Sequence, residues 1–408
     1  MAEDDSLSSA NPIYDHGVVN FISNRREARA DFLRVSHQIH VPQLLAYMTR
    51  QWHLPVPGII VHITGSAQSF DLPAKLVKPI TDGVVSVASV ANAWILTGGL
   101  DSGVMALVGS AMSRWKHRCE KAPLIGVAPW RAVTSNDKLE RACGGKVEYF
   151  ASSPNSSASA GLEANHTQLL LVDTEEEGES PWGGELEVLE KLQQQLRRAY
   201  EAPTVLVVIQ GGANTLQNVL RSLRQGVVTV VAADSGQVAS AIAEYMRSGE
   251  VAKEWRAHAA AFDEIRRLNQ TASRHDELKG AFNDEWPLIT LFFLRGRDHI
   301  GEAVLSAVMR QSPIEKRLEF AVQWNRSDLL EELLGSIPAY QRHRRSLLRS
   351  TLQQALELER PEMVGTCLRA HATCCTRVPR ETIAEGHAHA PSTPHPLHAR
   401  ARACGGRR

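Results

Sequence analysis

Six short apolar runs, rich in Val and Ile, recur along the first 250 residues. Each run is continuously apolar rather than alternating, which is typical of strands buried on both faces of a parallel sheet. The runs predict strands at 58–64, 93–97, 124–128, 168–173, 204–209 and 227–233.

Helical patterns separate these runs. Apolar residues recur at intervals of three or four positions in 71–91, 186–198, 214–224 and 238–246. Repeated alternation of strand and helix predicts a doubly wound α/β fold, in which ligands bind beyond the carboxyl ends of the strands.

Beyond about residue 250 the pattern predicts helices and no further strands. Two amphipathic helices over 313–338 are interrupted at 325–327, and another pair over 345–372 is interrupted at 360–361. Paired helices with short turns indicate an all-α helical repeat of ankyrin-like or solenoid type. At the first break, Trp324 is expected in the core, and Asp328 either caps the second helix or pairs with Arg326.

The chain therefore divides into five predicted parts. They are an N-terminal segment (1–40), an α/β domain (41–250), a helical linker (251–310), helical repeats (311–372) and a disordered tail (373–408). The tail has few core-forming residues. Its histidines are either metal ligands or part of an end without packed structure: His387, His389, His395 and His398.

Composition excludes several classes of protein. Lys plus Arg and Asp plus Glu number 45 each, so net charge gives no general reason to bind nucleic acid or an anionic membrane. The apolar run 286–294 is shorter than the about 20 residues of a membrane span. Six cysteines without a CxxC pair predict no zinc site, and the acidic N-terminus is no signal peptide, so we expect a cytoplasmic chain with reduced thiols.

Small polar turns follow three of the predicted strands. Thr97, Gly98 and Gly99 precede a helix that starts near Asp101 or Ser102, and a helix N-terminus beside glycines binds anions well. The alternative is a tight turn with Ser102 as the helix N-cap. We expect the carboxylate of Asp101 to face solvent, because it would repel a phosphate.

The other two turns contain Gly211, Gly212 and Thr215 after one strand, and Ser235 and Gly236 after another. Because parallel strands end at the same edge of a sheet, the three turns predict a nucleotide-like pocket. Asp234 either hydrogen-bonds a ribose hydroxyl or caps the following helix.

An ordered series of motifs resembles the N-terminal region of the TRPM (melastatin) cation channels. The stretches are "QWHLPVPGIIVHITG", "AWILTGGLDSGVMALVG", "NHTQLLLVD", "GGANT", "LITLFFL", "RLEFAVQWNRSDL" and "RPEMVGTCL". The resemblance runs from about residue 14 to residue 372.

The resemblance implies a Rossmann-like domain of SLOG type followed by ankyrin-like helical repeats. In the family this region forms the cytoplasmic part of a tetrameric cation channel, so the implied partners are channel subunits, as homo- or heterotetramers. The chain would be a truncated product that lacks the pore and its calcium site.

The family also implies a ligand and no required cofactor. Some members bind ADP-ribose in the SLOG pocket, and the residues implied for its wall are Thr97, Gly98, Gly99, Ser102, Gly103, Gly126, Gly211, Gly212, Thr215, Ser235 and Gly236. Two departures weaken the expected phosphate binding. Gln237 stands where the family often has Arg, and Asp234 stands where it often has Gly.

SLOG domains resemble nucleotide-cleaving enzymes of the LOG type, which carry a catalytic Glu after a glycine turn. The corresponding position here is Asn218, and an amide cannot act as a general base. A dinucleotide-dependent redox enzyme would need a G-x-G-x-x-G turn, which is missing. We therefore expect no enzyme. The alternatives to a ligand-sensing channel region are a nucleotide-binding protein or LOG-like hydrolase relative that acts without a channel, and an assembly module without a ligand.

Overall fold

The computed structural model describes residues 13–22, 28–67, 72–89, 92–140, 142–150, 159–174, 181–275, 287–296, 299–337 and 343–376. The chain divides into two compact units, Met1–Trp324 and Asn325–Arg408. Within the described residues, no helix has both the length and the apolar character needed to cross a membrane.

A ten-stranded sheet forms the centre of the first unit, with the order β10-β9-β8-β3-β4-β5-β7-β2-β1-β6. All described strand pairs are parallel except β1 with β2. The strands are β1 (Ile13–Phe21), β2 (Ala28–Ser36), β3 (Ile59–Gly65), β4 (Ala93–Thr97), β5 (Leu124–Pro129), β6 (Lys146–Tyr149), β7 (Gln168–Asp173), β8 (Thr204–Ile209), β9 (Val228–Ala232) and β10 (Ile289–Phe292).

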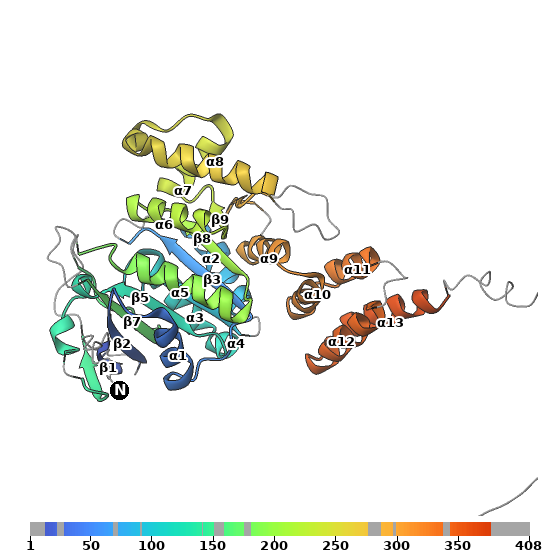
Figure 1. Ribbon diagram of the computed structural model, residues 1–408, viewed down its shortest axis with the longest axis horizontal. Coiled ribbons are helices and arrows are strands. Elements are labelled where there is room, and N and C mark those ends of the chain that lie inside the picture. The colour runs from blue at the N-terminus through green and yellow to red at the C-terminus, as the bar shows by residue number, and fades with distance from the viewer. Residues whose placement is uncertain are drawn as a thin grey trace, which may run out of the picture. The chain divides into compact units, whose positions relative to one another are not determined.

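Helices flank this sheet, and α10 contacts α9 rather than the strands (Figure 1). In the first unit they are α1 (Val41–Gln51), α2 (Ala74–Ala88), α3 (Gly103–Arg114), α4 (Lys116–Cys119), α5 (Glu185–Tyr200), α6 (Ala213–Arg224), α7 (Gln237–Ser248), α8 (Ala259–His275), α9 (Ile300–Gln311) and α10 (Ile314–Gln323). Short 3-10 helices lie at η1 (Trp130–Ala132), η2 (Asn136–Lys138) and η3 (Lys253–His258).

Two apolar clusters anchor these helices to the strands. Leucines of α1 and α5, such as Leu44 and Leu192, pack with Ile60 of β3 and Leu170 of β7. The second cluster joins α6, α7 and α8 to β8 and β9, with Leu216, Ile242 and Phe262 against Val208 and Val231. Burial of these side chains is the main stabilising term of the unit, because each removes apolar area from water.

The six predicted strands are confirmed as β3, β4, β5, β7, β8 and β9, which are contiguous in the sheet. The prediction that strands end at about residue 250 is wrong, because β10 pairs in parallel with β9. This strand covers only four residues of an apolar run. The strands β1, β2 and β6 were not predicted, since polar residues interrupt each of them.

The second unit contains α11 (Ser327–Ser336), α12 (Arg344–Glu357) and α13 (Pro361–Thr376), and α13 packs against both others. The chain is thus an α/β sheet domain followed by a helical C-terminal region, as predicted. Both predicted helix breaks are confirmed, with Asn325 left-handed (φ 56°) at the first. The five domain boundaries stay predictions, and the tail histidines lie outside the described residues.

At the start of α11, Asp328 pairs with Arg326 through contacts of 2.9 and 2.7 Å. The hydrogen bonds from Arg326 lower the pKa of the Asp328 carboxyl to about 2. In the first unit, the Trp324 ring lies edge-on to Phe320, with ring centroids 5.9 Å apart.

Candidate functional site

The three glycine turns meet at one edge of the sheet, because β4, β3, β8 and β9 are neighbours and end on the same side. Hydrogen bonds join the second turn to the end of β3 and to the third turn. The Thr215 hydroxyl donates to the Gly65 carbonyl at the end of β3 over 3.2 Å, and the Gln210 N–H donates to the Ser235 hydroxyl over 2.8 Å. The predicted site residues are therefore brought together.

Three buried side chains, Glu163, His166 and Thr97, form a hydrogen-bonded relay that fixes the first turn, after β4. Glu163 Oε2 lies 2.8 Å from His166 Nδ1, and His166 Nε2 lies 2.7 Å from Thr97 Oγ1. Thr97 Oγ1 also accepts the Gly99 N–H over 3.1 Å. These bonds are mutually compatible when His166 donates from Nδ1 to the Glu163 carboxylate and accepts the Thr97 hydroxyl proton at Nε2.

The relay residues are closed off from solvent, with exposed fractions of 0% for Thr97, 1% for His166 and 3% for Glu163. Thr97 therefore shapes the turn, and a direct contact between its hydroxyl and a ligand would require this region to open. Its ligand-binding role stays a prediction. The three side chains were not predicted as a unit: the sequence analysis named Thr97 as a site residue and the "NHT" motif marked His166, whereas Glu163 was not singled out.

A strap formed by residues 159–166 covers the inner side of the first turn. The Glu163 N–H donates to the Gly99 carbonyl over 3.0 Å, and the Asp101 N–H donates to the Gly161 carbonyl over 2.7 Å. The Tyr149 hydroxyl accepts the Leu162 N–H over 3.1 Å, and burial raises the pKa of this phenol. Backbone groups of the first turn are thus bonded to the chain's own strap.

Glycine is needed at Gly99 because the backbones crowd there. Gly99 has a φ of 71°, and a Cβ on it would lie 2.8 Å from the Cα of Gly126 in the neighbouring strand β5. Gly103 has a φ of 55°, and a Cβ on it would lie 1.7 Å from the Ser66 carbonyl oxygen. Gly99, Gly103 and Gly126 therefore permit close packing whether or not a ligand binds.

The N-terminus of α3 is partly occupied by the chain itself. The Val104 N–H donates to the Ser66 carbonyl over 3.1 Å. Ser102 stands at the N-cap position without a side-chain cap, and its buried Oγ has no hydrogen-bond partner among the described residues. Asp101 is exposed, as predicted, and partial burial followed by the charge of Glu163 raises the pKa of its carboxyl.

The second turn, after β8, faces outward. Gly212 and Asn214 at the start of α6 are exposed, whereas Gly211 and Thr215 are buried. Gly211 has a φ of 102°, which favours glycine, and its N–H donates to Oε1 of Gln237 over 3.1 Å. This turn offers backbone at the surface with the positive end of a helix behind it.

The third turn, after β9, is fastened to the second. The Ser235 hydroxyl donates to the Ala232 carbonyl over 2.7 Å while it accepts the Gln210 N–H, so it is fully engaged. Gly236 is partly exposed. The Asp234 carboxylate accepts the N–H groups of Leu294 and Arg295 over 2.7 and 3.1 Å. It therefore caps the turn after β10, a role that sequence reasoning did not consider.

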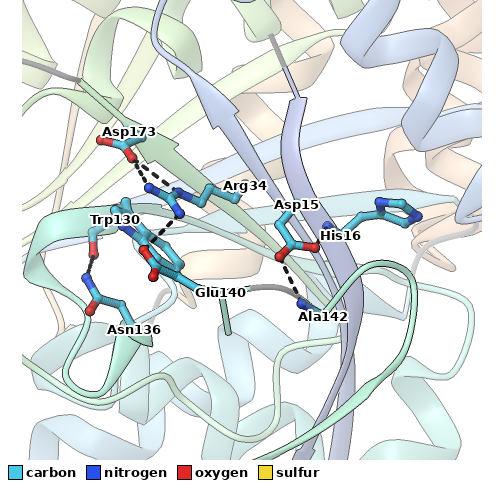
Figure 2. A network of polar contacts seen from close by, with 8 residues as sticks. All are labelled: Asp15, His16, Arg34, Trp130, Asn136, Glu140, Ala142 and Asp173. Atoms are coloured by element: carbon cyan, nitrogen blue, oxygen red, sulfur yellow. Dashed lines mark hydrogen bonds and ion pairs between the residues drawn. The ribbon is translucent and has the colours of Figure 1, made fainter. Parts of the chain in front are cut away.

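A second polar cluster, not found from the sequence, lies at the same edge beyond β5 and β7. Figure 2 shows Arg34 of β2 donating to Asp173 from Nε and Nη2, over 3.1 and 2.6 Å, and to Glu140 over 3.2 Å. The guanidinium stacks on the Trp130 ring at 4.0 Å from its centroid. Two carboxylates satisfy this cation, so it acts as a clamp on the excursion after β5.

Asp15 of β1 fixes the far end of that excursion. Its carboxylate accepts the N–H group of Ala142 over 2.9 Å (Figure 2). It also accepts the N–H groups of Cys143 over 2.9 Å and of His16 over 2.7 Å. Together with the contacts of Arg34 it holds residues 130–140 and 142–149 against β1 and β2. The cluster was not found from the sequence, because Arg34 and Asp15 lie in strands that the pattern does not reveal.

Comparison with known proteins identifies the family. The model described as "SLOG in TRPM" matches residues 30–277. The chain belongs to this family. The matched segment runs from β2 to the end of α8, so it includes all three glycine turns.

The relatives of this TRPM SLOG chain are much longer proteins. A "transient receptor potential cation channel subfamily M member-like 2" of Nematostella vectensis is 27% identical over 359 residues, 79% of the chain and 23% of the relative. A "transient receptor potential cation channel trpm" of Drosophila melanogaster is 28% identical over 391 residues, 88% of the chain and 19% of the relative. Subfamily M member 2 of Mus musculus is 30% identical over 226 residues, 52% of the chain and 15% of the relative. The chain thus spans about a fifth of the length of these relatives.

A buried histidine lies in the middle of the SLOG sheet. His62 of β3 is 2% exposed, and its Nδ1 has no hydrogen-bond partner among the described residues. Burial lowers the pKa of the imidazole to about 4, so the side chain is neutral at pH 7. Among the described residues, no cluster of three or more His, Cys, Asp or Glu side chains could hold a metal ion.

Proposed function

We propose that this chain is the ligand-sensing and assembly region of a TRPM-like cation channel, without catalytic activity of its own. The family match over residues 30–277 and the cation-channel relatives support this proposal. In the proposed function the chain lies in the cytoplasm, at the inner face of the membrane when it is assembled with subunits that carry a pore. We further propose that its sheet is Rossmann-like and that its C-terminal helices are ankyrin-like repeats.

The proposed ligand is an adenine nucleotide derivative, with ADP-ribose as the first candidate, and it binds through its phosphates. The observation that carries this proposal is the outward-facing second turn, where Gly212 and Asn214 are exposed at the N-terminus of α6. Backbone N–H groups and the helix dipole favour an anion at such a place.

The first turn suits phosphate less well. Its Gly99 N–H and carbonyl are bonded inside the chain, and the carboxylates of Asp101 and Glu163 lie close by. Negative charges at short range oppose a phosphate in a partly buried site. We propose that the second turn holds most of the ligand and that the first turn contributes the Ser102 hydroxyl as a hydrogen-bond donor.

A thermal-shift titration of the full chain with ADP-ribose, ADP and AMP tests ligand binding. Ligand at about 100 times its dissociation constant adds about 2.7 kcal/mol to the free energy of unfolding, enough to raise the melting temperature by degrees. We expect a saturable shift with ADP-ribose. No shift at millimolar ligand would leave an assembly module without a nucleotide.

Co-purification tests the assembly role. We expect the tagged chain to retain a full-length TRPM-like subunit from the same source, and a chain ended at residue 324 to retain less of it, because the second unit is then missing. Failure of the full chain to retain the long subunit would contradict assembly through this region.

The proposal excludes cleavage of the ligand. Asn218, at the position of the LOG-type carboxylate, is buried, and its Nδ2 lies 3.4 Å from the Thr64 hydroxyl. A carboxamide cannot accept the proton of an attacking water. Incubation of the chain with ADP-ribose is expected to release no free nucleobase or ribose phosphate, and catalytic release would contradict a sensor.

A further inference from the structure

We propose that Gln237 is a built-in competitor of the ligand. Its amide oxygen occupies the Gly211 N–H, the donor that a phosphate oxygen would take. This inference rests on the proposed function, because it concerns the same second turn. It makes Gln237 a residue that sets which ligands bind and how tightly.

The backbone holds Gln237 against the second turn. The Val238 N–H donates to the Gly211 carbonyl over 3.0 Å, and the Ala239 N–H donates to the Gln210 carbonyl over 3.2 Å. These two bonds fasten the first turn of α7 to the end of β8. With the backbone fastened in this way, Oε1 of Gln237 accepts the Gly211 N–H over 3.1 Å.

Because of these two bonds, the N–H groups of Val238 and Ala239 at the N-terminus of α7 do not bind an anion. The N–H groups of Val238 and Ala239 are among those that a bound phosphate would use at a helix N-terminus, and both are given to carbonyls. Side-chain oxygens accept the remaining N–H groups described at this junction: Gln210 donates to the Ser235 hydroxyl, Gly236 to the Ser240 hydroxyl, and Gly211 to the Gln237 amide oxygen.

The local conformation shows that this arrangement is specific. Gln237 has a φ of 52°, a left-handed conformation that is unfavourable for a residue with a Cβ. Gly236 before it has a φ of 104°. The chain thus turns sharply in front of α7, and this turn directs the exposed Gln237 side chain toward Gly211.

The neutral amide oxygen of Gln237 competes more strongly with neutral ligand groups than with a charged phosphate. A charged phosphate oxygen makes a stronger hydrogen bond than a neutral acceptor does, so a phosphate displaces the amide with a net gain. A ribose hydroxyl or a base carbonyl only exchanges one neutral acceptor for another. The second turn should therefore select ligands that bring an anionic phosphoryl oxygen to Gly211, at an affinity reduced by the competition.

The first part of the test asks whether the hydrogen bond from the Gly211 N–H to the Gln237 amide oxygen forms in the absence of a ligand. Gln237→Met keeps the side-chain length and removes the amide group with its acceptor oxygen. Labelling with 13C-carbonyl Gln and 15N-Gly selects Gln–Gly peptide bonds, and the sequence has two, at Gly211 and Gly226. We expect faster amide exchange at Gly211 in the variant and no change at Gly226, whose N–H is bonded to the Leu223 carbonyl. Unchanged exchange at Gly211 overturns the inference.

The second arm measures competition by calorimetric titration with ADP. Gln237→Met should bind ADP about three- to tenfold more tightly, the range that one net hydrogen bond covers. Gln237→Glu should bind more weakly than wild type, because its carboxylate keeps the cap and repels phosphate. Gln43→Met, on the exposed surface of α1, should bind as wild type.

The outcomes separate the inference from the proposed function. Weaker ADP binding by Gln237→Met overturns the competition, since it would mean that the amide helps to hold the ligand. If neither protein binds ADP while the exchange at Gly211 is faster in the variant, the proposed nucleotide site fails and the competition fails with it. Tighter binding together with faster exchange supports both.

Discussion

The two glycine turns after β4 and β8 read alike in the sequence and are used differently in the fold. The first lies over a buried relay and is bonded to the chain's own strap at Gly99. The second exposes Gly212 and Asn214 at the start of α6. A glycine turn at the carboxyl end of a strand therefore serves either chain packing or ligand access, and what lies beneath it decides which.

Electrostatics point the same way as exposure. The first turn lies near Glu163 and Asp101, so a phosphate there would meet two carboxylates. The cap on the second turn is a neutral amide, which a phosphate can displace. We therefore expect an anion to bind at the second turn, and we expect mutations at the first turn to destabilise the fold most.

The largest effect is expected at the relay beneath the first turn. His166→Leu leaves the Glu163 carboxylate buried without the imidazole and leaves the Thr97 hydroxyl without an acceptor. Breaking such a buried pair costs about 3–5 kcal/mol of the free energy of unfolding, measured by urea denaturation. Asn214→Leu at the exposed second turn is the control and should change it by about 0.5 kcal/mol or less. Equal losses would contradict the comparison.

The strand between the two turns should give the next effect, through His62. The folded chain keeps this imidazole neutral down to a pKa of about 4, whereas the unfolded chain takes up a proton near 6.5. The contribution of the neutral His62 side chain to the free energy of unfolding is thus fully present above pH 6.5 and is lost as the pH falls toward 4. The loss should be about 3 kcal/mol relative to His62→Leu, whose stability is free of this dependence. Parallel pH profiles of the two proteins would show that the strand is hydrated.

Alanine at one glycine of each turn compares them directly. A methyl group on Gly99 meets the Cα of Gly126 at 2.8 Å, whereas one on Gly212 meets no atom within 4 Å. Gly99→Ala should cost about 2 kcal/mol or more, and Gly212→Ala should stay within about 0.5 kcal/mol, both by urea denaturation. A larger loss for Gly212→Ala than for Gly99→Ala would contradict the assignment of the first turn to chain packing and of the second to ligand access.

A smaller effect is expected where the second turn is tied to β3. Thr215→Val removes the hydroxyl that donates to the Gly65 carbonyl over 3.2 Å, at a cost of about 1 kcal/mol. Thr215→Ser keeps the hydroxyl and should recover most of that stability in the same thermal melts. No difference between the Val and Ser variants would show that this bond contributes nothing.

The central strands could be predicted from the sequence because each is a continuous apolar run buried on both faces. β2 could not, since Arg29, Asp31 and Arg34 interrupt it, and Arg34 has its partners 106 and 139 residues away. β10 was missed because its run read as one apolar stretch followed by arginines.

The candidate site was predicted in part. The sequence located the glycine turns and their common edge, since strand ends in a parallel sheet share one side. It did not reveal the direction in which each turn faces, because that depends on Glu163 and His166, which reach Thr97 only in the folded chain. It likewise marked Gln237 only as a missing cation, whereas the fold bonds its oxygen to Gly211.

One calorimetric titration tests the central claim, that phosphate binds at the second turn. ADP-ribose would be titrated into wild type, into Asn214→Asp at the exposed start of α6, and into Ser110→Asp on the exposed surface of α3. The account predicts saturable binding by wild type, a loss of about tenfold or more in affinity for Asn214→Asp because a carboxylate then faces the phosphate, and no change for Ser110→Asp. Equal affinity of all three proteins, or no binding by wild type, would contradict it.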